Sequence, residues 1–396
     1  MVNYFSDLQE KVGAYTRKYA KHPCKAAVKM AFWNMKYLLK LITDTQIIEK
    51  LKPEQNKTVS CCFELGGGLG DIVLALNYLV CLKQRFPNIH LTITIDKRFF
   101  NEVETILFEQ DFVDELSTTK DKKQKYDVRI KLVRMPYVRY VNKTIVKKLY
   151  PEFYNFITKV ENFNLENVMY NFSGSCSDFL VEKYTLLQKR KRIAEADVEN
   201  YIGVTSQFEI KQSLNAEDVL SKFALDGCKY ITIQRGVGVC DYNQNGYSTR
   251  IWPIKHYNQL VTMLKQEYPD YKIVQVGANT CIQIDNIDLN LCGKTSFAEM
   301  LAILQNSLLH IDGECGMVHL RHFLGAKPSV VLFGPTNENF YGYEENINMA
   351  NRPCGGSCEW LCANWRDFCM FDGALPMCQQ NLNPTNVFAR IKEVLK

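Results

Sequence analysis

The sequence predicts an α/β protein made of two doubly wound, Rossmann-like domains that face each other across a cleft, preceded by a helical extension. Apolar runs of strand length alternate with segments of helical spacing in two successive sets. Glycine-rich loops follow strands in both sets, as they do in sheets that bind nucleotides. The 396 residues are also enough for two domains with a core each.

Residues 1–57 are the expected helical extension, because the stretch AVKMAFWNMKYLLKLI is amphipathic at helical spacing. Its apolar face could pack on the body of the protein, form an oligomer contact or touch a membrane surface. Packing or oligomerisation is the interpretation that we favour, since an apolar stripe usually serves a core.

The first domain should begin with a strand, a glycine loop and a helix. Residues 58–65 are a strand candidate, followed by the loop GGGLGD at 66–71 and a helical pattern to residue 86. The loop is not a P-loop, since no Gly-Lys-Ser/Thr follows it. The spacing leaves two roles open for Asp71: capping the helix, or taking a proton from an incoming hydroxyl.

Further strands are expected at residues 91–96 and 125–133, with a helix at 101–110 between them. Residues 135–192 are rich in Tyr and Phe and contain a basic run at 189–192. Such a run is typical of a solvated helix face, although cations with aromatic residues could also hold a bulky polar acceptor.

The second domain should start near Gly227. A strand at residues 229–234 leads into Arg235-Gly236-Val237-Gly238, and a polar loop then reaches Arg250-Ile251-Trp252-Pro253. A helix is expected at 256–268, strands at 271–276 and 289–292, and a further helix after Thr295. Ser296 and Glu299 fit a capping box at the start of that helix.

The stretch LLHIDGECGMVHLRHFLGAKPSVVLFGPT, residues 308–336, predicts a strand, a tight turn, a helix and a second strand at 329–333. The amides of Cys315, Gly316 and Met317 should lie at the helix N-terminus. Such amides, together with the helix dipole, form an anion site.

Fifteen cysteines are many for a chain without a secretory signal, and five of them fall between Cys354 and Cys378. The spacing favours a tetrahedral zinc or iron site held by Cys354, Cys358, Cys369 and Cys378. Cys362 is left out because its spacing suits a core-facing helix. Buried thiols without a metal are the alternative.

The net charge and the length of the apolar runs limit the kinds of partner and the cellular compartment that we expect. The net charge of +5 is small for this length, so nucleic acid is not an expected partner. No apolar run is long enough to span a bilayer, and the start MVNYFSDLQEKV has no signal-peptide core. We therefore expect a cytoplasmic protein.

Four segments together resemble glycosyltransferase family 9, the ADP-heptose heptosyltransferases: GGGLGDIVLALNYL, STRIWPIKHYNQLV, LCGKTSFAEMLAIL and GECGMVHLRHFLGAKPSVVLFGPT. The resemblance covers most of residues 58–396. It implies a GT-B fold and transfer of a sugar, with inversion, from a nucleotide diphosphate donor. The implied parts are an acceptor-side domain at 58–222, a donor-binding domain at 223–383 that includes the cysteine loop 354–378, and a C-terminal helix at 384–396.

The resemblance also implies roles for single residues. Asp71 matches the general base, and Arg250 falls where the family places a lysine that meets the donor phosphates. Glu314 stands where an aspartate that contacts the sugar is commoner, and His319 matches the family histidine. The residues expected to bind the donor are Gly68, Gly70, Arg235, Gly236, Gly277, Thr295, Glu314, Cys315, Gly316, Met317 and His319.

The cysteine cluster resembles that of the autotransporter heptosyltransferase branch. That branch implies a structural iron, a serine acceptor on an autotransporter adhesin and a homo-oligomer. Three alternatives stay open: a lipopolysaccharide-core heptosyltransferase, a nucleotide-sugar epimerase with different acid and base groups, and a zinc-bearing nucleic-acid module. The last lacks a basic helix after the cysteines.

Overall fold

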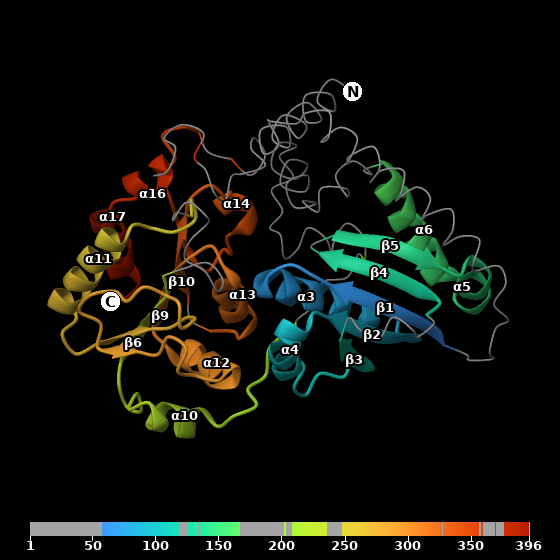
Figure 1. Ribbon diagram of the computed structural model, residues 1–396, viewed down its shortest axis with the longest axis horizontal. Helices are drawn as coiled ribbons and strands as arrows, with labels where there is room; N and C mark the ends of the chain where they lie inside the picture. Colours follow the sequence, from blue (N-terminus) through green and yellow to red (C-terminus); the bar gives the residue numbers. More distant parts are fainter. Residues whose placement is uncertain are drawn as a thin grey trace, which may run out of the picture.

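The structure is a computed structural model. It describes residues 58–118, 126–133, 135–166, 202, 208–235, 248–326, 328–355, 358, 369 and 376–395. The predicted extension at 1–57, the basic run at 189–192, Gly236 and Cys362 lie outside the described residues. The described chain forms two α/β bodies, each built on one sheet, which lie side by side in Figure 1.

The first sheet has five strands in the order β3-β2-β1-β4-β5. Their bounds are β1 Val59–Leu65, β2 Ile89–Ile95, β3 Glu115–Thr118, β4 Val128–Val133 and β5 Met135–Val141. Strand β1 is central and pairs in parallel with β2 and β4, whereas β5 runs antiparallel to β4. Neither β3 nor β5 was predicted from the sequence, because β3 is short and mostly polar and β5 contains Pro136, which is tolerated at a sheet edge.

The helices of the first body are α3 Leu69–Arg85, the 3-10 turn η1 Lys97–Phe99, α4 Phe100–Ile106, α5 Lys143–Leu149 and α6 Pro151–Glu166. Helix α3 is buried over most of its circumference, which explains its long apolar run. Asp71 in its first turn and Arg85 in its last complement the helix dipole. The helix ends just before Phe86-Pro87, as the restriction on a residue preceding proline requires.

The second sheet has six parallel strands in the order β11-β10-β9-β6-β7-β8. Their bounds are β6 Tyr230–Ile233, β7 Lys272–Gln275, β8 Leu289–Asn290, β9 Leu309–Gly313, β10 Ser329–Phe333 and β11 Ile347–Ala350. Chain order reverses between β6 and β9, and ligands bind at such a switch point in open α/β sheets. The central strands β9 and β10 are buried along their whole length.

The helices of the second body are α10 Ala216–Lys222, α11 Ile254–Glu267, α12 Phe297–Asn306, α13 Gly316–Phe323, α14 Glu338–Tyr341, α16 Met377–Asn381 and α17 Pro384–Val394. The capping box predicted for α12 is confirmed, since Ser296 and Glu299 each accept the other's amide hydrogen. Helix α17 packs against α11, and α10 packs against α12.

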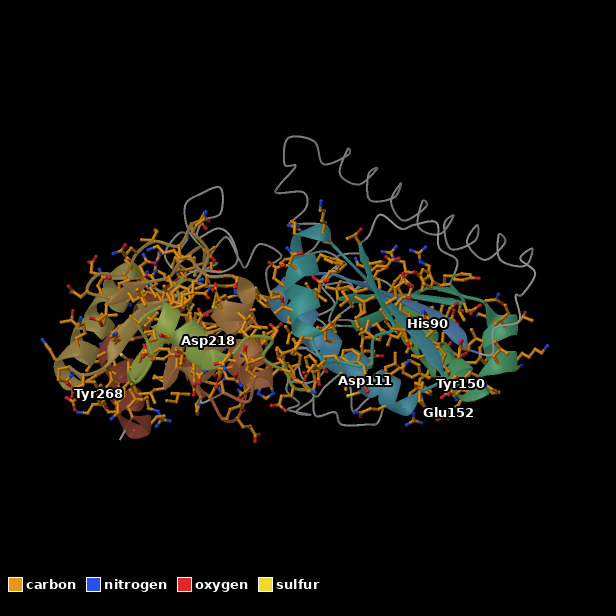
Figure 2. All side chains as sticks on the ribbon, turned by 90° about the horizontal axis from the view of Figure 1, so that it is seen from below. His90, Asp111, Tyr150, Glu152, Asp218 and Tyr268 are labelled. Carbon is orange, nitrogen blue, oxygen red and sulfur yellow. The ribbon has the colours of Figure 1, made fainter. Side chains whose placement is uncertain are left out.

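The two bodies meet where α3 lies against α13 (Figure 1). One apolar cluster runs through both of them and includes Leu76 of α3 and Val318 of α13. Figure 2, turned by 90°, shows the same division, with Asp218 of α10 in one body and Tyr150 in the other. The fold class expected from the sequence, two parallel-sheet α/β bodies, is therefore confirmed for the described chain.

None of the helices in the described part of the chain combines the length and the apolar character that a membrane span needs.

Candidate active site

The first side of the site is the loop that joins β1 to α3. Gly67 has a φ of +95°, a conformation that favours glycine, and it turns the chain toward the helix. The Gly68 amide donates a hydrogen bond of 2.8 Å to Oδ2 of Asp71. Asp71 thus contributes to capping, one of its two expected roles. A carboxylate has about four acceptor positions, so this bond does not exclude the second role.

The second side is the turn between β9 and α13. Gly313 ends the strand, Glu314 is at the tip of the turn, and Cys315 in an extended conformation is the N-cap of α13. The Cys315 thiol donates to Asp312 and makes no capping hydrogen bond. The amides that open α13 are consequently those that the sequence predicted for anion binding.

These two sides touch through a pair of glycines. A Cβ atom on Gly70 would lie 3.2 Å from the Cα atom of Gly316, and one on Gly316 would lie 3.1 Å from the Gly70 amide nitrogen. Any side chain at either position would push the helices apart, so the two glycines allow the N-termini of α3 and α13 to meet. The structure therefore brings Asp71 and the turn of Glu314 to one place in the molecule.

Arg250 is held over this turn by the segment that precedes α11. Trp252, two residues later, is buried and donates its indole N–H to the Leu382 carbonyl at 2.9 Å. The Arg250 guanidinium donates to the backbone carbonyl of Glu314 and, at 2.8 Å, to Oε2 of the same residue. This cation and carboxylate are about four-fifths buried or more, so water screens the pair only partly.

His319 lies between the two helices. Its Nδ1 is 2.6 Å from the hydroxyl of Tyr343, and its Nε2 is 3.9 Å from Oε1 of Glu314. A Cβ atom on Gly70 would lie 2.7 Å from the His319 ring. The histidine is buried and hydrogen-bonded, yet it also faces Glu314, so the alternatives of a structural and a ligand-contacting histidine both have support.

The remaining donor-site candidates lie on loops after neighbouring strands. Arg235 is buried at the end of β6, beside β9 in the sheet. The Gly293 amide donates to the Gly277 carbonyl at 2.9 Å, which joins the loops after β7 and β8. Thr295 follows in the second of these loops and is half-buried.

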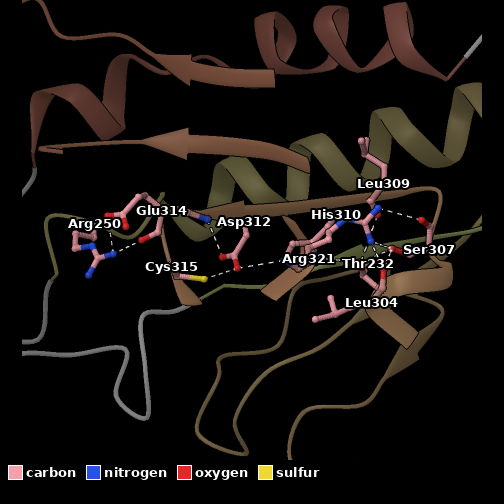
Figure 3. A network of polar contacts seen from close by, with 11 residues as sticks. Thr232, Arg250, Leu304, Ser307, Leu309, His310, Asp312, Glu314, Cys315 and Arg321 are labelled. Carbon is pink, nitrogen blue, oxygen red and sulfur yellow. Dashed lines mark hydrogen bonds and ion pairs between the residues drawn. The ribbon is translucent and has the colours of Figure 1, made fainter. Parts of the chain in front are cut away.

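A buried polar network lies beneath the turn (Figure 3). Asp312 and His310, two residues apart on β9, both have 0% exposure and are linked by a contact of 3.2 Å from His310 Nε2 to Asp312 Oδ2. His310 Nδ1 contacts the Thr232 hydroxyl at 3.0 Å, and this hydroxyl lies 3.0 Å from the Ser307 hydroxyl. Arg321, also buried, donates to Ser307 at 2.6 Å.

Burial governs ionisation in this network. It raises the pKa of the Asp312 carboxyl, although the hydrogen bonds that the carboxylate accepts oppose the change. It also lowers the pKa of the His310 imidazole, which is therefore disfavoured as a cation. Neither residue was singled out in the sequence analysis. Polar side chains two positions apart in a buried strand are nevertheless a signal, because buried polar groups need hydrogen-bond partners.

The four cysteines predicted as metal ligands lie near one another. Burial raises the pKa of the Cys378 thiol to about 12, and the nearby thiols of Cys358, Cys369 and Cys354 add to the shift. All of them except Cys354 are buried. Among the residues that the structure describes, however, no group of three or more His, Cys, Asp or Glu side chains is arranged to hold a metal ion.

This arrangement suits the departure of a phosphate group from a sugar. Helix-terminal amides and a guanidinium can hold an oxyanion, and a carboxylate on the adjoining loop can accept a proton. The two groups come from different bodies of the protein, as in enzymes that bind donor and acceptor on separate domains.

Comparison with known proteins supports this interpretation. Residues 181–359 match the family model described as glycosyltransferase family 9 (heptosyltransferase). No individually curated protein matched the chain.

Solved structures show the same fold at low identity. A family 9 glycosyltransferase from Veillonella parvula DSM 2008 is 16% identical and has a TM-score of 0.55, over 87% of this chain and 99% of the other. The iron-containing dodecameric glycosyltransferase TibC from enterotoxigenic E. coli H10407 is 10% identical, with a TM-score of 0.56, over 87% and 78%. TibC in complex with ADP-D-beta-D-heptose is 12% identical, with a TM-score of 0.52, over 87% and 79%.

Two facing parallel-sheet bodies with these neighbours define the GT-B fold, and together with the family match they make this protein a glycosyltransferase. More particularly, residues 181–359 match the model of glycosyltransferase family 9.

Proposed function

We propose that this protein is an inverting glycosyltransferase that moves a heptose from ADP-heptose to a hydroxyl of its acceptor. The observation that carries the proposal is the contact of α3 with α13, because it brings the first turn of α3, which contains Asp71, to the N-terminus of α13, and a helix N-terminus favours anions. The family match to heptosyltransferases and the structure of TibC with ADP-D-beta-D-heptose support the choice of sugar and nucleotide.

The donor diphosphate would bind to the amides of Cys315, Gly316 and Met317. Negative charge builds on the phosphate oxygens as the bond to the sugar breaks, and fixed donors aimed at such charge contribute roughly 3–4 kcal/mol each. Arg250 would supply a cation without a divalent ion. Glu314, which Arg250 holds through its carboxylate, would then meet the sugar hydroxyls.

Asp71 would act as the general base. The acceptor oxygen attacks the anomeric carbon, the bond from this carbon to the β-phosphate oxygen breaks, and ADP leaves with the bonding pair. Asp71 takes the proton of the acceptor hydroxyl in the same step. Attack opposite to the departing phosphate inverts the anomeric centre.

Thermal unfolding in the presence of a panel of nucleotide sugars tests the donor. A ligand that binds the folded chain raises the midpoint by mass action, and at about a hundred times its Kd it adds about 2.7 kcal/mol. We expect ADP-heptose and ADP to stabilise the protein and UDP-sugars to leave it unchanged. Release of nucleotide from UDP-N-acetylglucosamine without any acceptor would instead favour the epimerase alternative.

For the acceptor we propose a serine hydroxyl of an autotransporter adhesin, on the strength of the resemblance to that branch. Incubation with ADP-heptose and either a serine-rich adhesin fragment or a lipopolysaccharide-core acceptor separates the two alternatives. Mass increase of the fragment alone supports the proposal, and modification of the core alone supports the alternative.

We also propose that Cys354, Cys358, Cys369 and Cys378 hold one structural iron or zinc. The three neighbouring thiols add to the rise in the pKa of Cys378, and a bound cation would stabilise the four thiols as thiolates. Such a metal would fasten the loop that follows β11. Metal analysis should find about one ion per chain. The ion should be lost in Cys378→Ser and kept in Cys228→Ser, while a metal-free wild-type protein would contradict the proposal.

A homo-oligomer is proposed as well, because the TibC structures with this fold are dodecameric. Light scattering after size-exclusion chromatography measures the mass in solution. A multiple of the monomer mass is expected, and the mass of a monomer would contradict the proposal. The cytoplasmic location expected from the sequence stays a prediction.

A further inference from the structure

Asp312 lies directly before the turn between β9 and α13, and the transfer reaction does not use its carboxylate. The two oxygens of this carboxylate bind the residues on both sides of Glu314. Oδ1 accepts the Gly313 amide at 2.7 Å, and Oδ2 accepts the Cys315 thiol at 2.7 Å. Glu314 is therefore the tip of a turn whose two neighbours are fastened to one buried carboxylate (Figure 3).

The network behind Asp312 supports this carboxylate from below. His310 Nε2 is 3.2 Å from the same Oδ2 that receives the Cys315 thiol. An ionised carboxylate only accepts hydrogen bonds, so the ring must present its Nε2–H, and Nδ1 is then the acceptor for Thr232. The carboxylate, which itself has 0% exposure, thus receives donors from three residues, and these offset part of its desolvation.

We propose that Asp312 is a positioning residue that fixes the turn of residues 313–315 in the shape that binds the donor diphosphate. The inference rests on the proposed function, because it concerns the same donor site. Asp312 touches neither donor nor acceptor in this scheme. It acts through the backbone of Gly313 and the side chain of Cys315, which set the direction of the first amides of α13 and of the Glu314 carboxylate.

The variant Asp312→Asn distinguishes positioning of the turn from a role limited to filling space. The asparagine side chain has the size of aspartate but only one oxygen, so it cannot accept from Gly313 and Cys315 on separate oxygens. A matched control is Asp288, whose carboxylate accepts the Ile273 amide at 2.8 Å in the same body, away from the turn. Asp312→Asn and Asp288→Asn make the same chemical change, and only the first should alter donor binding.

A second pair of variants tests the contact if Asp312→Asn does not fold. Cys315→Ser keeps a hydrogen-bond donor for Asp312, whereas Cys315→Ala removes it and leaves a buried acceptor with one partner fewer. A role limited to filling space predicts that serine and alanine behave alike. A positioning role predicts that serine restores what alanine loses.

The experiment is calorimetric titration of each full-length variant with ADP, repeated with ADP-heptose. We expect Asp312→Asn and Cys315→Ala to weaken ADP binding about tenfold, the factor that corresponds to the loss of one charge-assisted hydrogen bond. Cys315→Ser should bind ADP more tightly than Cys315→Ala, and Asp288→Asn should stay within about twofold of wild type. Equal affinities in wild type, Asp312→Asn and Cys315→Ala would overturn the inference and leave the proposed function intact. A wild-type protein that binds neither ligand would overturn both.

Discussion

Gly70, in the first turn of α3, packs on Gly316, the first residue of α13. The backbone atoms of the two residues approach so closely that a Cβ atom at either position would come within 3.2 Å of the other. The two glycines thus allow close contact between α3 and α13, which are far apart in the sequence. The proposed donor and base sites depend on this contact for their proximity.

Alanine at position 70 should therefore separate the helices. Its Cβ atom would lie 2.7 Å from the His319 ring and 3.2 Å from Gly316, and overpacking of this kind typically costs about 1–3 kcal/mol. We expect Gly70→Ala to lower the free energy of unfolding in urea by that amount and to reduce sugar transfer. Gly68→Ala is the control for stability, because its nearest neighbour is 3.8 Å away and its φ of −86° suits any residue. Equal unfolding free energies in the two variants would show that the helices are not held by the glycine pair.

The contact of Arg250 with Glu314 gives a second prediction. Arg250→Lys keeps the positive charge but removes the guanidinium nitrogen Nη2, which reaches both the carbonyl and the carboxylate of Glu314. We expect the KM for ADP-heptose to rise about tenfold, the effect of one charge-assisted hydrogen bond. Arg98→Lys, at an exposed fork on Asp96, should leave KM unchanged.

A double-mutant cycle with Glu314→Gln shows whether the two residues act together. Coupled residues give a double variant that departs from the sum of the single effects by at least about 0.5 kcal/mol. Additivity within that margin would mean that Arg250 and Glu314 serve the donor independently.

Acid stability should depend on Glu299 at the start of α12. The hydrogen bond from Lys222, followed by that from the Ser296 amide, lowers the pKa of its carboxyl below the ordinary value. A lowered folded pKa means that this stabilisation is present above the unfolded pKa and is lost as the pH falls through the folded pKa. Glu299→Gln should therefore be less stable than wild type at pH 7, with a difference that shrinks in acid. Urea unfolding at several pH values measures it, and a difference that does not change with pH would rule out ionisation as the cause.

The sequence was sufficient for the elements that have strong local signals. Residues 329–333 were predicted as a strand from an apolar, β-branched run, and β10 has these bounds. The Ser296 and Glu299 box was predicted from spacing, because capping involves only neighbours in the chain. The parallel-sheet fold followed from the alternation of such elements.

Contacts between segments that are distant in the chain could not be predicted from the sequence. The glycine pair joins residues 70 and 316, and neither glycine reveals its partner in the sequence. His310 lies in the apolar run of residues 308–311 and Asp312 follows it, and neither stands out in the sequence, because the role of each depends on contacts with Thr232 and Cys315. Strand β5 was not predicted because Pro136 has a low strand propensity. The strand forms because its pairing with β4 outweighs that propensity.

The role of Asp71 is the centre of the account, and asparagine at this position tests it most directly. Asparagine can still accept the Gly68 amide hydrogen and so keep the capping contact, but it cannot take a proton. Asp96→Asn is the control, since Asp96 also caps a turn by accepting an amide hydrogen. The measurement is the rate of heptose transfer from ADP-heptose, with ADP affinity determined on the same samples. We predict that Asp71→Asn binds ADP like wild type and transfers about a hundred to ten thousand times more slowly. Transfer at the wild-type rate in that variant would contradict the account and leave Asp71 as a helix cap.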